Sequence, residues 1–312
     1  MKRIACCISI FLIVFLPTSI ISQTRTANPE KAAQYEKFAT LRKSNNAAQR
    51  KLAYEAAKEY LGKYDGDHEA HTEAVRLYIR EYEARSLNDD LNKAFKEGNF
   101  AMVILVGDQI LKTDPDNFSV LMNMLYAAYT TAINGDKSLN EKGLTLALKA
   151  NSLIDKKPQN PAPWKSVVEV ETFIQYAAGV FALDANPVES AKALSSVAHS
   201  KTFYKDSPLV YYYLGMAVLK GEWHTLFDAN EKKYAGQGDS AERRTDEEKA
   251  LLVANRAIDY LARGVALAKG PENESTRKKL REELTAVYKI FHNGSDVGLD
   301  ELVNTIVTKP LP

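Results

Sequence analysis

Apolar side chains recur along most of this chain at steps of three and four residues, the spacing that places them on one face of an α-helix. The stretch that begins at Pro29 is an example, with Tyr35, Phe38 and Leu41 on one face. No segment alternates apolar and polar residues over the length of a strand. The pattern therefore predicts an all-α protein from residue 29 to at least Ile306.

Short groups rich in Gly, Pro, Asn and Asp interrupt this pattern, and these residue types turn, cap and end helices. They occur at 62–67, 114–117, 134–137, 157–163, 185–187, 205–208, 236–240, 269–273 and 292–298. Their spacing predicts helices of ordinary length joined as antiparallel hairpins, with helix starts at Phe118, Trp164 and Leu209. The segment 222–245 is expected to be one long irregular insertion.

Two segments carry a more specific pattern. The first holds Gly98-Asn99-Phe100, Ile104, Ile110-Leu111, Asp114-Pro115-Asp116-Asn117, Leu121, Met124, Ala127 and Tyr129. The second holds Tyr211, Leu214-Gly215, Ala217 and Gly221-Glu222-Trp223. Both resemble a tetratricopeptide repeat, in which a Gly and an aromatic residue close the turn between two helices and small residues fill the seam of the hairpin.

This resemblance implies antiparallel helical hairpins stacked as a right-handed α-solenoid over residues 29–312, because each hairpin needs its neighbours to bury both apolar faces. It also implies a structural role for Gly98. We expect this residue to lie where two helices approach most closely, so that any side chain would collide with the neighbouring helix.

The resemblance further places a set of side chains on the concave surface that such proteins use to bind a partner. The set is Ser119, Met122, Tyr126, Tyr129, Tyr212, Met216 and Leu219. Tyrosine and methionine make adaptable contacts with a peptide. The alternative is that the tyrosines belong to the core, since apolar stripes on helices are usually buried.

Candidate catalytic and metal-binding patterns are sparse. His68 and His71 stand three apart, so they share a helix face and are suitable zinc ligands, with Asp65 and Asp67 just before them. A helix start capped by Asp67 explains the same residues. No phosphate-binding loop, nucleophile elbow or catalytic triad spacing is evident. The sequence therefore predicts no enzymatic activity, no cofactor and no metal.

The N-terminal residues predict export. Met1-Lys2-Arg3 and an apolar run up to Leu16 are typical of a secretory signal peptide, here assigned to residues 1–22, and residues 23–28 are expected to be a flexible start of the mature chain. Cys6 and Cys7 are the only cysteines, so a cleaved chain would have no disulfide and no lipid-modified cysteine. We expect a soluble periplasmic or extracellular protein.

The balance of charged side chains limits the classes of partner that the protein is expected to bind. The whole chain has 41 basic and 40 acidic side chains, and loss of Lys2 and Arg3 leaves the acidic side chains in excess by one. This balance does not favour nucleic acid binding, which needs a basic surface. No later apolar run is of transmembrane length. The sequence favours a non-enzymatic scaffold or adaptor of the cell envelope that binds a protein or peptide. The alternative is a solute- or glycan-binding protein in which Trp164 and Trp223 stack on the ligand.

Overall fold

The computed structural model describes residues 28–312, and these residues form helices without any strand. The α-helices are α1 (Pro29–Leu41), α2 (Ala47–Tyr64), α3 (Ala70–Lys96), α4 (Phe100–Thr113), α5 (Phe118–Ile133), α6 (Asn140–Lys156), α7 (Val167–Ala182), α8 (Pro187–Ala198), α9 (Pro208–Val218), α10 (His224–Lys233), α11 (Ala241–Leu267), α12 (Glu274–Phe291) and α13 (Leu299–Thr305). Shorter helical turns are η1 (Phe203–Asp206), η2 (Leu219–Trp223), η3 (Pro271–Asn273) and η4 (Ile306–Thr308). The predicted signal peptide 1–22 and residues 23–27 lie outside the described part.

Polar residues in the predicted breaks cap the helices that follow them. The side chain of Asn117 accepts a hydrogen bond from the backbone N–H of Val120 at the start of α5, and Ser240 caps α11 in the same way. Such caps satisfy N–H groups that have no partner inside the helix. The predicted start at Phe118 is confirmed. The start predicted at Trp164 is wrong, because Ser166 caps α7 and the helix begins at Val167.

The chain divides into two compact units, one up to Arg85 and one from Ser86 to Pro312. The first unit contains α1 and α2, which pack against each other, and most of α3. Its small core includes Phe38, Tyr60 and Val75, all without exposed surface. This unit is built from few large apolar side chains, several of them aromatic.

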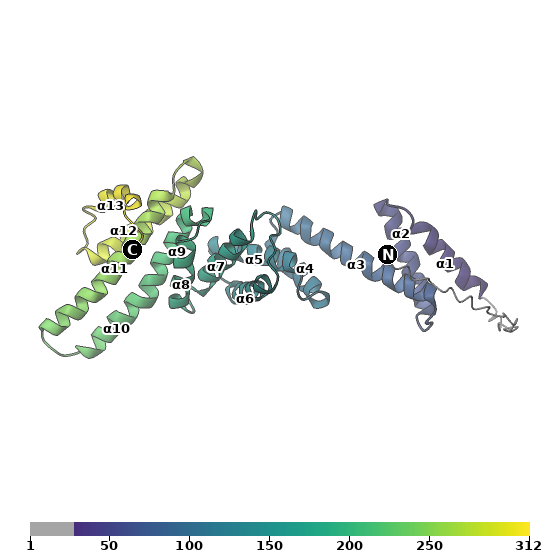
Figure 1. Ribbon diagram of the computed structural model, residues 1–312, viewed down its shortest axis with the longest axis horizontal. Helices are drawn as coiled ribbons and strands as arrows, with labels where there is room; N and C mark the ends of the chain where they lie inside the picture. Colours follow the sequence, from purple (N-terminus) through teal and green to yellow (C-terminus); the bar gives the residue numbers. More distant parts are fainter. Residues whose placement is uncertain (1–27) are drawn as a thin grey trace, which may run out of the picture. The chain divides into compact units, whose positions relative to one another are not determined.

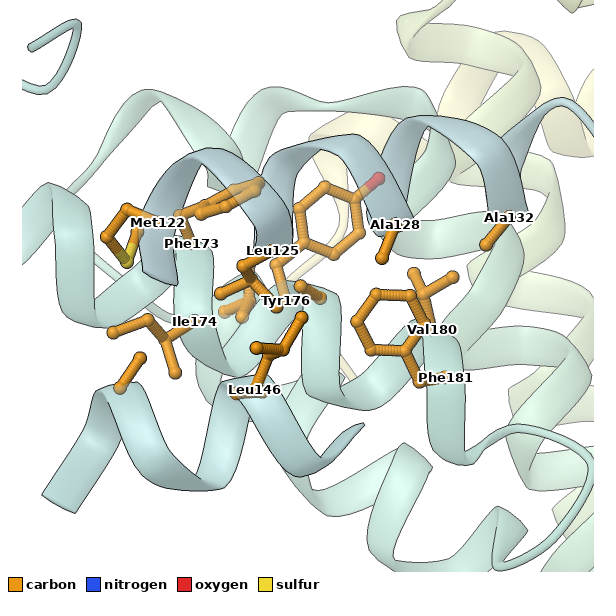
Figure 2. Close-up of a cluster of buried hydrophobic side chains, with 14 of the residues drawn as sticks. Met122, Leu125, Ala128, Ala132, Leu146, Phe173, Ile174, Tyr176, Val180 and Phe181 are labelled. Carbon is orange, nitrogen blue, oxygen red and sulfur yellow. The ribbon is translucent and has the colours of Figure 1, made fainter. Parts of the chain in front are cut away.

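In the second unit helices α4 to α9 pack in chain order, each one from α4 to α8 against the helix that follows it. The odd-numbered helices also meet: α7 contacts α5 and α9. Helix α9 then packs against α11, and α11 packs against α12 and α13. Figure 2 shows part of the resulting core, in which side chains of α5, α6 and α7 meet. One core cluster therefore extends through successive helices from α4 to α9, and a second lies mainly among α11, α12 and α13.

Gly98 does not have the packing role expected of it. A Cβ added there would meet no atom within 4 Å, so no neighbouring helix approaches this residue. Its φ is +68°, and its N–H donates to the carbonyl of Phe95 while the N–H of Asn99 donates to the carbonyl of Ala94. This is the glycine-dependent helix end in which the residue adopts a left-handed conformation. Gly98 therefore ends α3 through its backbone.

Close helix approach occurs instead at Gly215 on α9, a residue of the second repeat-like segment. A Cβ there would lie 2.8 Å from Leu261 Cγ and 2.9 Å from the carbonyl oxygen of Ala257, both on α11. Real Cβ atoms do not pack so closely in protein cores. The absence of a side chain at Gly215 thus permits the contact between α9 and α11.

The expectation of an irregular segment at 222–245 is wrong. Helix α9 continues through η2 into α10, and only the residues between Lys233 and Ala241 form a loop before α11. Helices α10 and α11 pack side by side (Figure 1). Helix α10 is short and none of its residues is fully buried. Its sequence therefore lacks the strong apolar stripe by which a helix is predicted.

Candidate functional site

The second unit contains a continuous set of ring contacts, here called the aromatic band. Its members are Phe95, Phe100, Tyr126, Tyr129, Trp164, Phe173, Tyr176, Phe203 and Tyr204. Eight of these pairs have ring centroids 5.1 to 6.4 Å apart, within the range of favourable aromatic pairs, and the Phe203–Tyr204 pair is closer, at 4.2 Å. The band thus links the end of α3, helices α4, α5 and α7, and the turn η1.

Helical spacing explains the centre of the band. Tyr126 and Tyr129 are three residues apart on α5, and Phe173 and Tyr176 are three apart on α7, so each pair shares one helix face. Tyr129 meets both residues of the opposite pair, at 5.5 Å from Phe173 and 5.1 Å from Tyr176. Aromatic rings are therefore one part of the contact between α5 and α7, beside the aliphatic side chains in Figure 2.

The band ends at an exposed residue. Phe203 in η1 is 62 % exposed although it is a large apolar side chain, and its ring lies 4.2 Å from that of Tyr204. Tyr126, Tyr129 and Tyr204 are partly buried. Partly buried tyrosines beside an exposed phenylalanine offer a partner apolar surface with polar tips.

Burial raises the pKa of three tyrosine hydroxyls of the band, those of Tyr129, Tyr176 and Tyr204. Burial raises the pKa of Tyr176 to about 12. The nearby hydroxyls of Tyr129 and Ser207 oppose that rise, although neither forms a hydrogen bond of normal geometry with Tyr176 Oη. Burial also raises the pKa of Tyr204 to about 12, opposed by the hydrogen bond that Trp164 Nε1 donates to Tyr204 Oη over 3.1 Å. The pKa of Tyr129 is raised well above its usual value by burial.

The four predicted residues of α5 divide into three environments. Ser119 is exposed. Tyr126 and Tyr129 lie in the aromatic band, partly buried. Met122 has no exposed surface and belongs to the core in Figure 2, so its assignment to an accessible groove is wrong. Helix neighbours bury it because α5 is covered on more than one face, by α4, α6 and α7.

The predicted residues of the second segment lie elsewhere. Tyr212, Met216 and Leu219 are partly buried and pack against a second cluster, formed mainly by α11, α12 and α13, and Met216 and Leu219 also pack against the main core. The ring of Tyr212 contacts that of Tyr213, at 5.1 Å. Tyr213 of α9 interacts electrostatically with Tyr129 and Tyr176 of the band, and α9 packs against α7. The structure therefore brings Tyr126 and Tyr129 together in the aromatic band and places the other predicted set on the neighbouring helix α9.

Sequence reasoning missed Phe203, Tyr204 and Phe173. Phe203 and Tyr204 stand directly before the predicted break at 205–208 and outside the two segments that resemble the repeat, so the resemblance assigns them no face. Phe173 had a usable signal, since it and Tyr176 repeat on α7 the spacing of Tyr126 and Tyr129 on α5. Repetition of an aromatic pair in two helices that contact each other indicates a shared contact.

A separate cleft of about 490 Å³ lies between α10, α11 and α12. Its apolar wall includes Trp223, Phe227, Leu251, Ile290 and Phe291. Trp223 stacks on Phe227 at 5.1 Å and meets Phe291 edge-on at 5.2 Å. The volume suits a small molecule.

Polar contacts hold the hairpin that forms this cleft. Lys233 of α10 pairs with Asp246 of α11 over 2.8 Å, and Tyr234 Oη donates to the same carboxylate over 2.9 Å. These hydrogen bonds, with a further one from Lys249, hold the pKa of Asp246 well below its usual value. Trp164, the other predicted stacking residue, is buried and hydrogen-bonded to Tyr204. It therefore cannot offer a ring face to a ligand in this conformation.

The histidine pair of the first unit has structural contacts. The ring of His71 stacks on that of Tyr35 with centroids 4.2 Å apart, and Asp67 accepts a hydrogen bond from Lys31 Nζ over 2.6 Å. Within residues 28–312, no three or more His, Cys, Asp or Glu side chains are grouped as metal ligands.

Comparisons with family models, curated proteins and solved structures give no match to this chain.

Proposed function

We propose that this protein is a non-enzymatic scaffold of the tetratricopeptide kind, and that it binds a segment of a partner protein on the aromatic band. The observation that carries the proposal is the band itself, which continues across several helices and ends in the exposed ring of Phe203. Tyrosine and tryptophan are enriched among residues that dominate protein interfaces. Such rings bury a large area at a low entropic cost because they have few rotatable bonds.

The order of helix contacts supports a repeat architecture. Helix α5 contacts α6 and α7, and α7 contacts α8 and α9. In stacked hairpins the first helix of one pair contacts both its own partner and the first helix of the next pair. In this proposal α5, α7 and α9 are first helices, and the aromatic band lies on the first two of them. The close contact of Gly215 with α11 also fits the small-residue seam of the family.

The cell envelope or the extracellular space is the proposed location, because the sequence of residues 1–22 is typical of a signal peptide. Among residues 28–312 no helix combines the length and the apolar character needed to cross a membrane.

The exposed end of the band allows a test that leaves the fold intact. Phe203 is 62 % exposed and Leu148 on α6 is 65 % exposed, so substitution of either by Ser should change stability little. We expect Phe203→Ser to reduce the amount of partner captured from a native envelope extract, and Leu148→Ser to leave it unchanged. Circular dichroism confirms that both variants remain helical. Equal capture by Phe203→Ser and the unchanged protein would reject the aromatic band as the binding surface.

The cleft beside Trp223 favours a second candidate function, the binding of a small solute or glycan by aromatic stacking. The chain has two tryptophans, so Trp164→Phe leaves Trp223 as the sole reporter. Saturable quenching of Trp223 fluorescence by a sugar or an aromatic solute would support this candidate. Quenching that is unchanged by Leu251→Asp in the cleft would contradict it.

A further inference from the structure

A buried arginine on α11 holds the last residues of the described chain. Arg263 is 8 % exposed, and its Nη2 donates to three carbonyl oxygens, those of Ile306 (2.9 Å), Lys309 (2.7 Å) and Pro310 (3.3 Å). Within residues 28–312 no carboxylate forms an ion pair with it, and its Nε is buried without a hydrogen-bond partner. Besides these carbonyl dipoles, the guanidinium charge interacts with the ring of Tyr211 and with the carboxylate of Asp259, where it opposes the rise that burial causes in the pKa of Asp259.

The held segment, Lys309–Pro312, has the character of a polyproline ligand. Lys309 has φ −84° and ψ 151°, close to the polyproline II conformation. Pro310 and Pro312 have no N–H, so the segment offers carbonyl acceptors and few donors. Tyr260 Oη donates to the carbonyl oxygen of Pro312 over 2.9 Å, and Leu311 packs against the main hydrophobic core.

The surface beneath this segment combines aromatic rings with hydrogen-bond donors. The guanidinium of Arg263 lies over the ring of Tyr211 on α9, 5.8 Å from its centroid, and Tyr260 stands one turn earlier on α11. Asp259 is also near, since the charges of Lys309 and Arg263 both oppose the rise that burial causes in the pKa of Asp259. Aromatic residues and donors to carbonyls are the features by which proline-rich segments are recognised.

We propose that this surface of α9 and α11 is a binding site for proline-containing extended segments with a preceding basic residue, and that the chain's own Lys309–Pro312 occupies it here. Main-chain carbonyls are present in any extended segment, so the site can accept the same chemistry from another protein. An apolar residue would fill the same space on α11 without the cost of desolvating a guanidinium, whereas Arg263 donates to three main-chain carbonyls of the segment. The use of Arg263 is therefore better explained by recognition than by packing. The site is separate from the aromatic band and adds a second interaction surface.

The direct test supplies the segment in trans. A chain that ends after Thr308 is mixed with a fluorescein-labelled peptide, Thr-Lys-Pro-Leu-Pro, and binding is followed by fluorescence anisotropy. We expect saturable binding to the shortened chain. For an effective concentration of about 1 mM and an intrinsic Kd of about 100 µM, the attached segment lowers the apparent affinity of the full chain for the peptide by about tenfold.

Matched variants identify the residues responsible. Arg263→Met in the shortened chain should reduce peptide binding at least tenfold, whereas Arg243→Met, at the far end of the same helix, should have no effect. A peptide with Ala in place of both prolines should bind at least several-fold more weakly. In the full chain, Leu311→Ser should raise peptide binding to a level between those of the full and shortened chains.

Three results would overturn the proposal. They are equal peptide binding by the full and shortened chains, no binding to a shortened chain that remains helical, and loss of helical structure on shortening without a gain in binding from Leu311→Ser. The last result would mean that the segment only completes the fold.

Discussion

Substitution of Gly215 by Ala adds a single methyl group at a close contact between α9 and α11. The new Cβ would lie 2.9 Å from the carbonyl oxygen of Ala257 and 2.8 Å from Leu261 Cγ. The backbone oxygen can move only if α11 moves. Overpacking of this kind costs about 1–3 kcal/mol, whereas alanine recovers about 0.5–1 kcal/mol through its better helix propensity.

Gly238, in the loop between α10 and α11, supplies a control in the same unit. A Cβ there meets nothing within 4 Å, so Gly238→Ala should raise the free energy of unfolding by about 0.4–1 kcal/mol, through the unfolded state. We therefore expect Gly215→Ala to be less stable than Gly238→Ala by about 1–3 kcal/mol.

Urea denaturation followed by circular dichroism measures this difference for the transition of the second unit. An m value that is the same in both variants would show that the change lies in stability and not in the extent of unfolding. If Gly215→Ala proved as stable as Gly238→Ala, the close packing of α9 on α11 would be incorrect, and with it the strongest packing support for the repeat architecture.

Three further predictions concern other positions. Gly98→Ala and Gly98→Leu should both lower the free energy of unfolding by about 1–2 kcal/mol, because the φ of +68° and not side-chain volume sets the cost. If urea denaturation showed a much larger loss for Gly98→Leu than for Gly98→Ala, Gly98 would have the packing role that the sequence suggested. Tyr176→Phe should leave the free energy of unfolding at pH 7 unchanged or raise it by up to about 1 kcal/mol, since it removes a buried hydroxyl without a hydrogen-bond partner; a loss above that size would contradict this account of the hydroxyl. Burial raises the pKa of Tyr176 from 10.0 to about 12, so the folded protein keeps the hydroxyl proton up to a higher pH than the unfolded chain does. The stability linked to this proton is present below pH 10 and is lost as the pH rises towards 12. Urea titrations over that interval should show a smaller loss of stability in Tyr176→Phe than in the unchanged protein.

The helical class and most helix boundaries could be predicted because they depend on local signals. Asn117 and Asn186 cap helices where the sequence breaks indicated them, since a capping side chain acts within three residues. The role of Gly98 could not be predicted by the same means. A glycine at a helix end and a glycine at a helix contact look alike in sequence, and only the backbone conformation distinguishes them.

The candidate site was less accessible to prediction because exposure depends on distant parts of the chain. Met122 and Tyr126 are one turn apart on α5, yet Met122 is fully buried and Tyr126 is only partly buried. Helical spacing places both on one face but does not say how far a neighbouring helix covers it. The contact of Arg263 with Lys309 joins residues 46 positions apart. No local pattern in the sequence indicates it.

The central claim, that a partner segment binds on the aromatic band, is tested most directly by site-specific photo-cross-linking. A photoreactive phenylalanine analogue at position 203 should form an adduct with a partner, and mass spectrometry should map the adduct to a single segment of that protein. The same analogue at position 148, equally exposed on α6, should form none. Adducts of equal yield at the two positions, or an adduct at position 148 alone, would contradict the claim.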